Sequence, residues 1–390
     1  MKIYWLSRSI ILPIMLAGLS AATSSAADSR TVLHISSRLP VQGSSRVLGA
    51  NRPQVAAHPS KMQSPSPAAN PWVLQSTLPG AVIHDISFPT YQVGFAAAEL
   101  GQVWKTTDGG ATWTEIVNLG FPYYWYGVHA LNTNDVVISG FNDNNFEGII
   151  RWSHDGGITW TDDIVLTTSG WSDRVRFANT QDGLVMDQLN LNGPNAAHYT
   201  SDGGATAADW TEDVPDPNGG WFGDQFSMLS NLRTRASGIT YCDSSDGGVN
   251  WACGPSIDQV FDGPTFFADQ NNGWVGGGEI SPNVEGWVHR TTDGGQTWSP
   301  RTLDIGWPIR EIYFLNPTTG WAAGGNIYTN AGGLYFSKDG GQTWTLDLDS
   351  NGAEMSSCAS APGPTNVQIW CAGYNSSFNG VVYRLQTLAH

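Results

Sequence analysis

Charged and titratable side chains recur in short apolar stretches of this sequence, where a folded chain keeps charge only if that charge is paired or used. Carboxylates such as Asp85, Asp224 and Glu311 could act as acid and nucleophile in glycoside cleavage. Histidines there could move a proton in a hydrolase or a lyase. The whole group comprises His84, Asp85, His129, Arg174, Arg176, Asp224, Arg310 and Glu311.

The three arginines of this group allow a different chemistry. Arg174, Arg176 and Arg310 could together bind an anion or a carboxylate, because guanidinium groups hold such ligands through paired hydrogen bonds. The structural alternative is a set of Arg–Asp and Arg–Glu bridges that tie neighbouring elements together. The sequence does not give the distances between these side chains, so both interpretations stay open.

Aromatic side chains form a second candidate group. Four tryptophans stand next to expected inner strands in four different repeats, and Tyr124 neighbours the first of them; they are Trp125, Trp171, Trp221 and Trp307. Such rings suit the faces of sugars and the apolar side chains of peptides. Packing between repeats is the alternative interpretation.

A repeated turn supplies the elements that must position these groups. The octad TTDGGATW (Thr106–Trp113) has five relatives, of which SKDGGQTW (Ser337–Trp344) is the last. Their aspartates follow one another at intervals of 47, 47, 44, 47 and 46 residues; they are Asp108, Asp155, Asp202, Asp246, Asp293 and Asp339. In the third copy the tryptophan is displaced to Trp210. A fixed period of this length indicates a repeat architecture.

The octad has a structural logic of its own. Aspartate accepts hydrogen bonds from following backbone amides, and the two glycines can adopt positive φ. The tryptophan is expected to fold back beneath the turn, where its indole N–H needs a partner. We therefore interpret the six turns as devices that shape the fold rather than as catalytic groups.

Four strands surround each turn. An apolar strand such as Ile309–Phe314 is followed by a glycine-rich strand such as Gly320–Asn326, by the strand that leads into the turn, and by an outer strand. Four strands in about 46 residues are typical of a propeller blade. The C-terminal part supplies only three strands, so we predict that Trp72–Thr77 pairs with Val381–Leu385. The expected fold is all-β: a seven-bladed β-propeller of four-stranded blades whose ring is closed by an N-terminal strand.

The first residues have a different character. Lys2 and Arg8 precede the apolar run Ile10–Leu19, and Ser25–Ala27 is a small-residue cleavage site. We predict a signal peptide over residues 1–27, a disordered Pro/Ser/Ala-rich linker over residues 28–70, and the propeller over residues 71–390. The expected location is therefore outside the cytoplasm, in the periplasm or the cell exterior.

Charge restricts the partners. The chain carries a formal charge of −16, and from Trp72 onward it holds 33 acidic and 11 basic residues. An acidic body argues against nucleic acid, because phosphate binding needs a basic surface. No later segment is apolar enough to cross a membrane. We expect a monomer without a cofactor.

The four cysteines are expected to form disulfides in an oxidising compartment. Cys242 and Cys253 flank one of the repeated turns, and Cys358 and Cys371 flank a Pro/Gly-containing turn. We predict the pairs 242–253 and 358–371. A metal site is the rival interpretation, but no CxxC pair or histidine cluster favours it, so we expect none.

The DGGxTW turns and the GWxxGG strands before them resemble the BNR/Asp-box propellers, most of all the photosystem II assembly/stability-factor-like branch. The clearest matches are Arg310–Gly325 with its turn at Ser337–Trp344, and His84–Trp113. The resemblance covers residues 72–390 and implies a propeller; family members of the branch are implied to be assembly chaperones that grip a polypeptide. Sialidases share the turn, but their Arg-Ile-Pro motif is not found here.

The leading hypothesis is an exported, non-catalytic binding propeller that holds a protein segment or a glycan over its central channel, on the face opposite the repeated turns. The alternative is a secreted carbohydrate-active enzyme, a glycoside hydrolase or lyase, that uses channel carboxylates or histidines. A third possibility is a structural module of a surface assembly. One fold hosts many roles, so the residues of the channel must decide.

Overall fold

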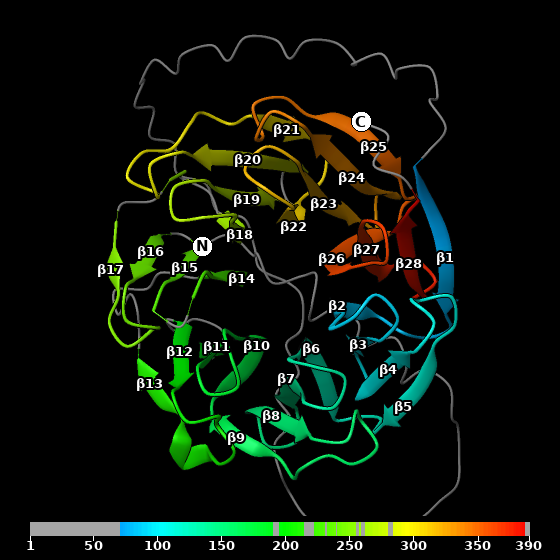
Figure 1. Ribbon diagram of the computed structural model, residues 1–390, viewed down its shortest axis with the longest axis vertical. Coiled ribbons are helices and arrows are strands. Elements are labelled where there is room, and N and C mark those ends of the chain that lie inside the picture. The colour runs from blue at the N-terminus through cyan, green and yellow to red at the C-terminus, as the bar shows by residue number, and fades with distance from the viewer. Residues whose placement is uncertain are drawn as a thin grey trace, which may run out of the picture. The chain divides into compact units, whose positions relative to one another are not determined.

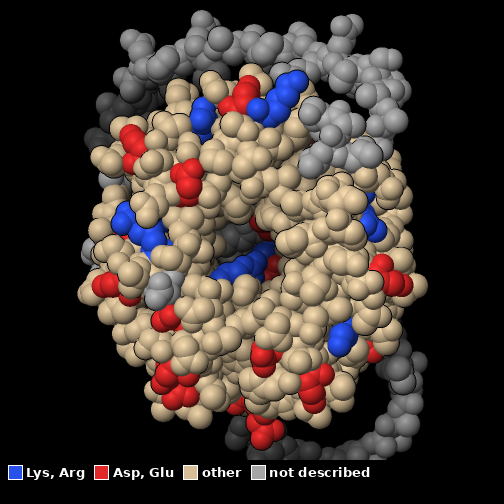
Figure 2. All heavy atoms as spheres, in the orientation of Figure 1, with Lys and Arg blue, Asp and Glu red and all other residues tan. Residues whose placement is uncertain are grey.

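The computed structural model describes residues 71–386, except 190–194, 214–221, 231, 239, 255–256, 259–261 and 280–283. The predicted signal peptide and linker lie outside the described residues. In the described part, seven four-stranded antiparallel sheets form a ring (Figure 1), and the hollow at its centre in Figure 2 is called the channel. The predicted all-β, seven-bladed propeller is confirmed.

Each blade is one sheet, and in blades 1 to 6 the strands follow the chain from the channel outward, whereas β1 is the outer strand of blade 7. Blade 1 contains β2 (Ile83–Ser87), β3 (Gly94–Ala98), β4 (Gln102–Thr106) and β5 (Thr114–Asn118). Blade 2 contains β6 (Tyr123–Ala130), β7 (Val136–Asn142), β8 (Glu147–Ser153) and β9 (Ile164–Thr167). Blade 3 contains β10 (Gly170–Phe177), β11 (Gly183–Leu189), β12 (Asn195–Thr200) and β13 (Thr211–Asp213), with a short 3-10 helix η1 (Ala207–Asp209) before β13.

The remaining blades repeat this order. Blade 4 contains β14 (Phe222–Met228), β15 (Thr234–Gly238), β16 (Tyr241–Ser244) and β17 (Ala252–Cys253). Blade 5 contains β18 (Asp262–Phe267), β19 (Gly273–Glu279), β20 (Glu285–Thr291) and β21 (Leu303–Ile305). Blade 6 contains β22 (Ile309–Phe314), β23 (Gly320–Asn326), β24 (Ala331–Ser337) and β25 (Thr345–Asp349). Blade 7 contains β26 (Glu354–Pro362), β27 (Val367–Tyr374), β28 (Gly380–Leu385) and β1 (Trp72–Leu78).

Blade 7 closes the ring with strands from both ends of the described chain. β1 pairs with β28 in antiparallel register, so that Trp72 lies opposite Leu385 and Thr77 opposite Val381. The predicted pairing is therefore confirmed. The Trp72 indole donates to Asp347 of blade 6 over 2.7 Å, which also fastens β1 to the neighbouring blade. Closure removes the open sheet edges that the first and last blades would otherwise expose.

The repeated turns have the expected internal bonding. In the first turn, Asp108 accepts from the Thr112 amide over 2.9 Å and from the Thr112 hydroxyl over 2.6 Å. Gly109 and Gly110 have φ values of 72° and 87°. The Trp113 indole donates to the Gly110 carbonyl over 3.2 Å, beneath the turn. These turns connect the third and fourth strands, and we call the end of the ring that carries them the box face.

Indole groups also join adjacent blades. Trp370 on β27 stacks on Phe88 and donates to the Gly109 carbonyl in the turn of blade 1 over 2.8 Å. Trp274 on β19 makes the same pair of contacts with Phe314 and the Gly340 carbonyl of blade 6. These two turns thus cap their own blades and accept a hydrogen bond from another, which makes them part of the joint between blades.

Two disulfides staple hairpins as predicted. Cys242 is bonded to Cys253 in blade 4, and Cys358 to Cys371 in blade 7. Such bonds persist in oxidising compartments, so they indicate that the protein folds in one. The described residues contain no helix that is long and apolar enough to span a membrane.

Candidate functional site

Every inner strand is irregular at the same level of the ring. Pairing between the first and second strands shifts register in all seven blades. The extra residue is His84 in blade 1, Tyr126 in blade 2, Arg310 in blade 6 and Ser356 in blade 7. A β-bulge redirects side chains, and the inner strands surround the centre of the ring (Figure 1), so the bulges bring polar groups of several blades toward one region.

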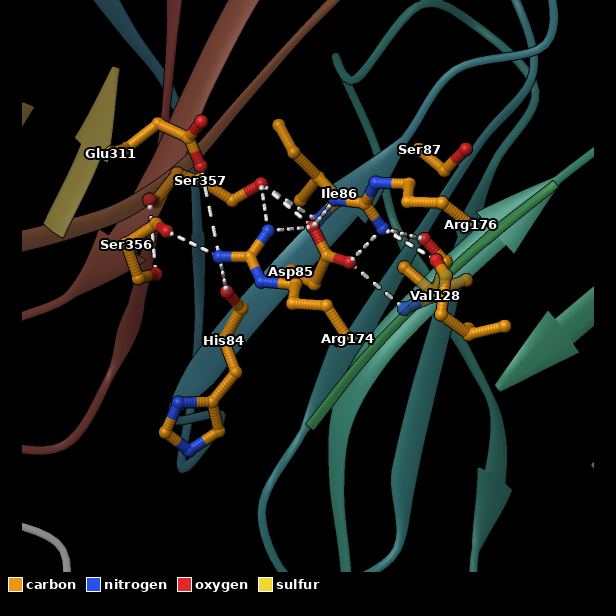
Figure 3. Close-up of polar contacts among 12 residues, drawn as sticks. His84, Asp85, Ile86, Ser87, Val128, Arg174, Arg176, Glu311, Ser356 and Ser357 are labelled. Carbon is orange, nitrogen blue, oxygen red and sulfur yellow. Dashed lines mark hydrogen bonds and ion pairs between the residues drawn. The ribbon is translucent and has the colours of Figure 1, made fainter. Parts of the chain in front are cut away.

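One ion pair links strands of non-adjacent blades. The Arg174 Nη1 atom on β10 lies 2.6 Å from Asp85 Oδ1 on β2 (Figure 3). Its Nη2 atom donates to the Ser356 carbonyl over 2.8 Å and lies 3.6 Å from Glu311 Oε2. Arg174 therefore connects blade 3 with blades 1, 6 and 7.

Asp85 is the centre of this arrangement, and its side chain is fully buried. It accepts from Arg176 Nη1 over 2.9 Å, from the Ser357 hydroxyl over 2.8 Å and from the Val128 amide over 3.0 Å. Burial opposes ionisation of this carboxyl, but Arg174 and Arg176 outweigh it and hold the pKa of Asp85 below 3.8. We call Asp85, Arg174, Arg176, Glu311 and Ser357 the channel knot.

The channel is visible as a hollow at the centre of the ring, and basic and acidic atoms line it (Figure 2). An anion site in the channel would need arginines that are available to the ligand, but Arg174 and Arg176 are already bonded to Asp85. Arg310, the third arginine of the predicted group, lies 3.0 Å from Glu354 in blade 7. The structure brings Arg174 and Arg176 together around Asp85 and pairs Arg310 with another carboxylate.

The two predicted histidines lie apart from each other in this region. His84 Nε2 is 3.2 Å from Glu99 Oε1, and the His84 ring meets the rings of Tyr126 and Tyr374 edge-on. His129 stacks on Phe177. Burial, followed by the nearby Arg176 charge, lowers the pKa of His129 to about 3, so the His129 ring is neutral at physiological pH.

Three of the predicted tryptophans lie between blades. Trp125 packs in the core with Phe95 of blade 1, Trp171 lies against Phe141 of blade 2, and Trp307 lies in the core between blades 5 and 6. Their rings are buried. This placement matches the packing alternative for these three residues. Tyr124 is half-buried. Trp221 lies outside the described residues, and only the backbone of Asp224, in β14, is described.

Sequence reasoning missed several members of the site. Glu99, Ser356, Ser357 and Tyr374 hold the predicted residues in place, yet none of them was singled out. Ser356 and Ser357 could have been found from their place on the expected first strand of the last blade, since that strand had to line the channel. The described residues contain no cluster of three or more His, Cys, Asp or Glu that could hold a metal ion.

Comparison with known proteins gives the repeat and the fold. The BNR/Asp-box repeat family matches residues 289–300 and 335–346, which include Asp293 and Asp339. The chain carries BNR/Asp-box repeats. Comparison with curated protein sequences finds no match.

Solved propellers resemble the whole ring. YCF48 bound to D1 peptide matches with a TM-score of 0.59 at 20% identity, over 83% of this chain and 100% of that one. YCF48 from Cyanidioschyzon merolae matches with a TM-score of 0.57 at 18% identity, over 80% and 98%. The WD40 propeller domain of Doa1 matches with a TM-score of 0.55 at 11% identity, over 80% and 96%. The predicted resemblance to photosystem II assembly-factor propellers is confirmed as a likeness of fold.

Proposed function

We propose that this protein is an exported binding propeller that holds an extended segment of another protein over the mouth of its channel. The binding surface is the loop face, which carries the turns between second and third strands and the connections from each outer strand to the next blade. The proposal rests on the β-bulges, which lie at the same level in all the inner strands. They bring side chains of different chemistry together around one opening.

The channel knot favours binding over glycoside cleavage. A glycosidase needs one carboxyl group with a raised pKa as the acid. Asp85 instead has a lowered pKa between two arginines, and Glu311 lies 3.6 Å from Arg174. These two carboxylates act as partners of the arginines and not as an acid and a nucleophile. We therefore assign the loop-face opening to recognition rather than to cleavage.

A peptide is favoured over a glycan as the occupant. The YCF48 propeller that matches this ring over its full length was solved with a peptide of D1 bound. We take from it the class of occupant, an extended polypeptide. The disulfides support an oxidising location for the complex, in the periplasm or outside the cell.

Parallel binding assays test this proposal. The purified full-length protein is applied to an array of short overlapping peptides from exported proteins and to an array of glycans. We expect saturable binding to a subset of the peptides and weaker binding by Arg310→Gln, which alters the channel mouth. Binding to glycans alone, or turnover of a polysaccharide that Asp85→Asn abolishes, would favour the carbohydrate-active alternative.

A further inference from the structure

The loop face of blades 1 and 2 exposes several large apolar side chains. The exposed fractions are 37% for Leu100, 38% for Leu119, 59% for Phe121 and 37% for Phe146. Half-buried Tyr124 belongs to the inner strand beside them. We call Leu100, Leu119, Phe121, Tyr124 and Phe146 the aromatic rim.

Backbone hydrogen bonds join the rim into one surface. The Leu119 amide donates to the Gly101 carbonyl over 3.2 Å, which links the connection between the two blades to the β3–β4 turn. The Asp143 amide donates to the Pro122 carbonyl over 3.0 Å, which links the same connection to the β7–β8 turn. The three segments of the rim are therefore held against one another.

Aromatic packing supports the rim from below. The Phe146 ring lies 5.2 Å from the Phe141 ring and 6.4 Å from the Trp171 ring, measured between centroids. Tyr124 lies 6.5 Å from Phe141. Because Phe141 and Trp171 are buried, the exposed Phe146 is the outer layer of a packed aromatic cluster rather than an isolated side chain.

Two residues of the rim have a backbone conformation that is unfavourable for residues with large side chains. Leu100 has φ 55° and Phe146 has φ 58°, in the left-handed region where glycine fits with less strain. Large apolar residues at such positions cost stability, and more than a third of each residue is exposed. The turn geometry therefore holds these apolar residues on the loop face.

The charges around the rim are negative. The rim segments 99–101, 119–122 and 143–146 contain two acids, Glu99 and Asp143, and no Lys or Arg. The backbone bond from Asp143 to Pro122 holds Asp143 beside the start of the strand that carries Tyr124, whereas Glu99 is buried and lies 3.2 Å from His84. Burial raises the pKa of Tyr124, and the negative charges of Glu99 and Asp143 raise it further. A cation that lies over Tyr124 would meet the Asp143 carboxylate and an aromatic face.

We propose that the aromatic rim binds an extended segment of another protein in which apolar residues stand next to Lys or Arg. The apolar side chains cover Leu119, Phe121 and Phe146, and a cationic side chain lies at Tyr124 beside Asp143. This inference rests on the proposed function and adds to it the position of the segment and its charge.

Two synthetic peptides test the inference directly. They share one extended sequence of Leu and Phe residues with alternating charged positions, which are Lys in one peptide and Glu in the other. Fluorescence anisotropy of each labelled peptide with the full-length protein gives the affinity. We expect the Lys peptide to bind at least about tenfold more tightly, and added salt to weaken it.

Substitutions locate the site. Phe121→Ser with Phe146→Ser should weaken the Lys peptide at least about tenfold, as expected for the loss of central anchors. Asp143→Asn should weaken the Lys peptide and leave the Glu peptide unchanged or improved. The matched controls are Ile158→Ser, which removes an apolar side chain that is 81% exposed on the box face of blade 2, and Asp162→Asn. Neither control should change the affinity.

The outcomes separate this inference from the proposed function. Equal binding of both peptides, no binding of either, or equal effects of rim and control variants would overturn the rim assignment. If the peptide array of the previous section still gives saturable binders, the proposed function stands without the rim. A photo-crosslinker at position 121 adds a direct reading: capture of residues 28–70 of the same chain, of a second copy, or of a glycan would also overturn the assignment.

Discussion

Arg174 on β10 lies 2.6 Å from Asp85 on β2, although blade 2 separates the two blades that carry them. The contact joins residues that are 89 positions apart, and the same guanidinium reaches Ser356, which is 182 positions away. A propeller buries its apolar surface between neighbouring blades, so contacts within and between adjacent sheets hold most of the ring. The channel knot adds links between blades that do not touch through their sheets.

Removal of Arg174 should therefore destabilise the whole ring. Arg174→Met leaves Asp85 with one arginine in a fully buried position, and loss of one partner of a buried ion pair costs about 3–5 kcal/mol. Urea unfolding measures the change in free energy. The control is Arg233→Met, because the Arg233–Asp243 pair is only partly buried and Asp243 keeps Arg235 as a second partner, so we expect a smaller loss. Equal losses in the two variants would contradict the role of the knot.

His129 should make stability depend on pH. The folded-state pKa of His129 is lowered to about 3, whereas an unfolded histidine titrates near 6.5. Between these values the unfolded chain takes up a proton that the folded chain does not. The contribution of His129 is thus complete above pH 6.5, and it is lost as pH falls toward 3, with a limiting slope of about 1.4 kcal/mol per pH unit.

The variant His129→Gln should flatten this dependence. Free energies of unfolding from urea titrations across the same pH window give the slope for both proteins. We expect the variant to lose less stability between neutral and mildly acidic pH than the unaltered protein. An unchanged slope would mean that the His129 imidazole takes up a proton in the folded state as well, or that water reaches it there.

The sequence was sufficient for the architecture because the information is local. Asp108 and its five equivalents specify a turn through hydrogen bonds within a few residues, and six such turns fix the period of the blades. Ring closure could be predicted by counting strands, because the last blade lacked one strand and Trp72–Thr77 could supply it. The disulfides followed because each pair flanks one hairpin.

The channel was harder to predict because its contacts are distant and its strands are irregular. Pairing shifts between Ser172 and Val175, and this bulge places Arg174 where it meets Asp85. A regular alternation of inward and outward residues does not predict such a shift. Burial of Trp125 was also undecided, because one position beside an inner strand serves packing between blades or binding at the mouth equally well.

The joint between blades 6 and 7 offers a test of ring closure. The Trp72 and Trp321 indoles both donate to Asp347 Oδ2, over 2.7 Å and 2.9 Å, and their rings meet edge-on. Trp72→Ala should remove a buried ring and one of these bonds, and such truncations cost about 3–5 kcal/mol. Hydrogen exchange should show that β1 loses protection first. Val73→Ala, at an exposed neighbour, should have little effect; similar effects of the two variants would mean that β1 does not close the ring through Trp72.

In the third repeated turn the aspartate makes fewer short hydrogen bonds than in the first, so we expect it to contribute less to the stability of the protein. In the first turn, Asp108 accepts from the amide and the hydroxyl of Thr112. In the third turn, the amide of the equivalent Thr206 donates to Asp209 over 2.7 Å, because the insertion that displaces Trp210 forms η1 there. Asp202 accepts from the Thr200 hydroxyl over 2.8 Å and weakly from the Gly204 amide over 3.5 Å.

Truncation of the two aspartates should therefore have unequal effects. Asp108→Ala removes the acceptor for three short bonds, because Asp108 also accepts from the Thr106 hydroxyl over 2.9 Å. Asp202→Ala removes one short bond and one long bond. We expect Asp108→Ala to lower the free energy of unfolding by about 1–2 kcal/mol more, which is the usual net contribution of one or two hydrogen bonds. Urea unfolding of the two variants under identical conditions measures the difference, and each variant serves as the control for the other. An equal or reversed order would mean that the Trp210 indole bond to the Gly204 carbonyl, rather than the aspartate, determines the stability of this turn.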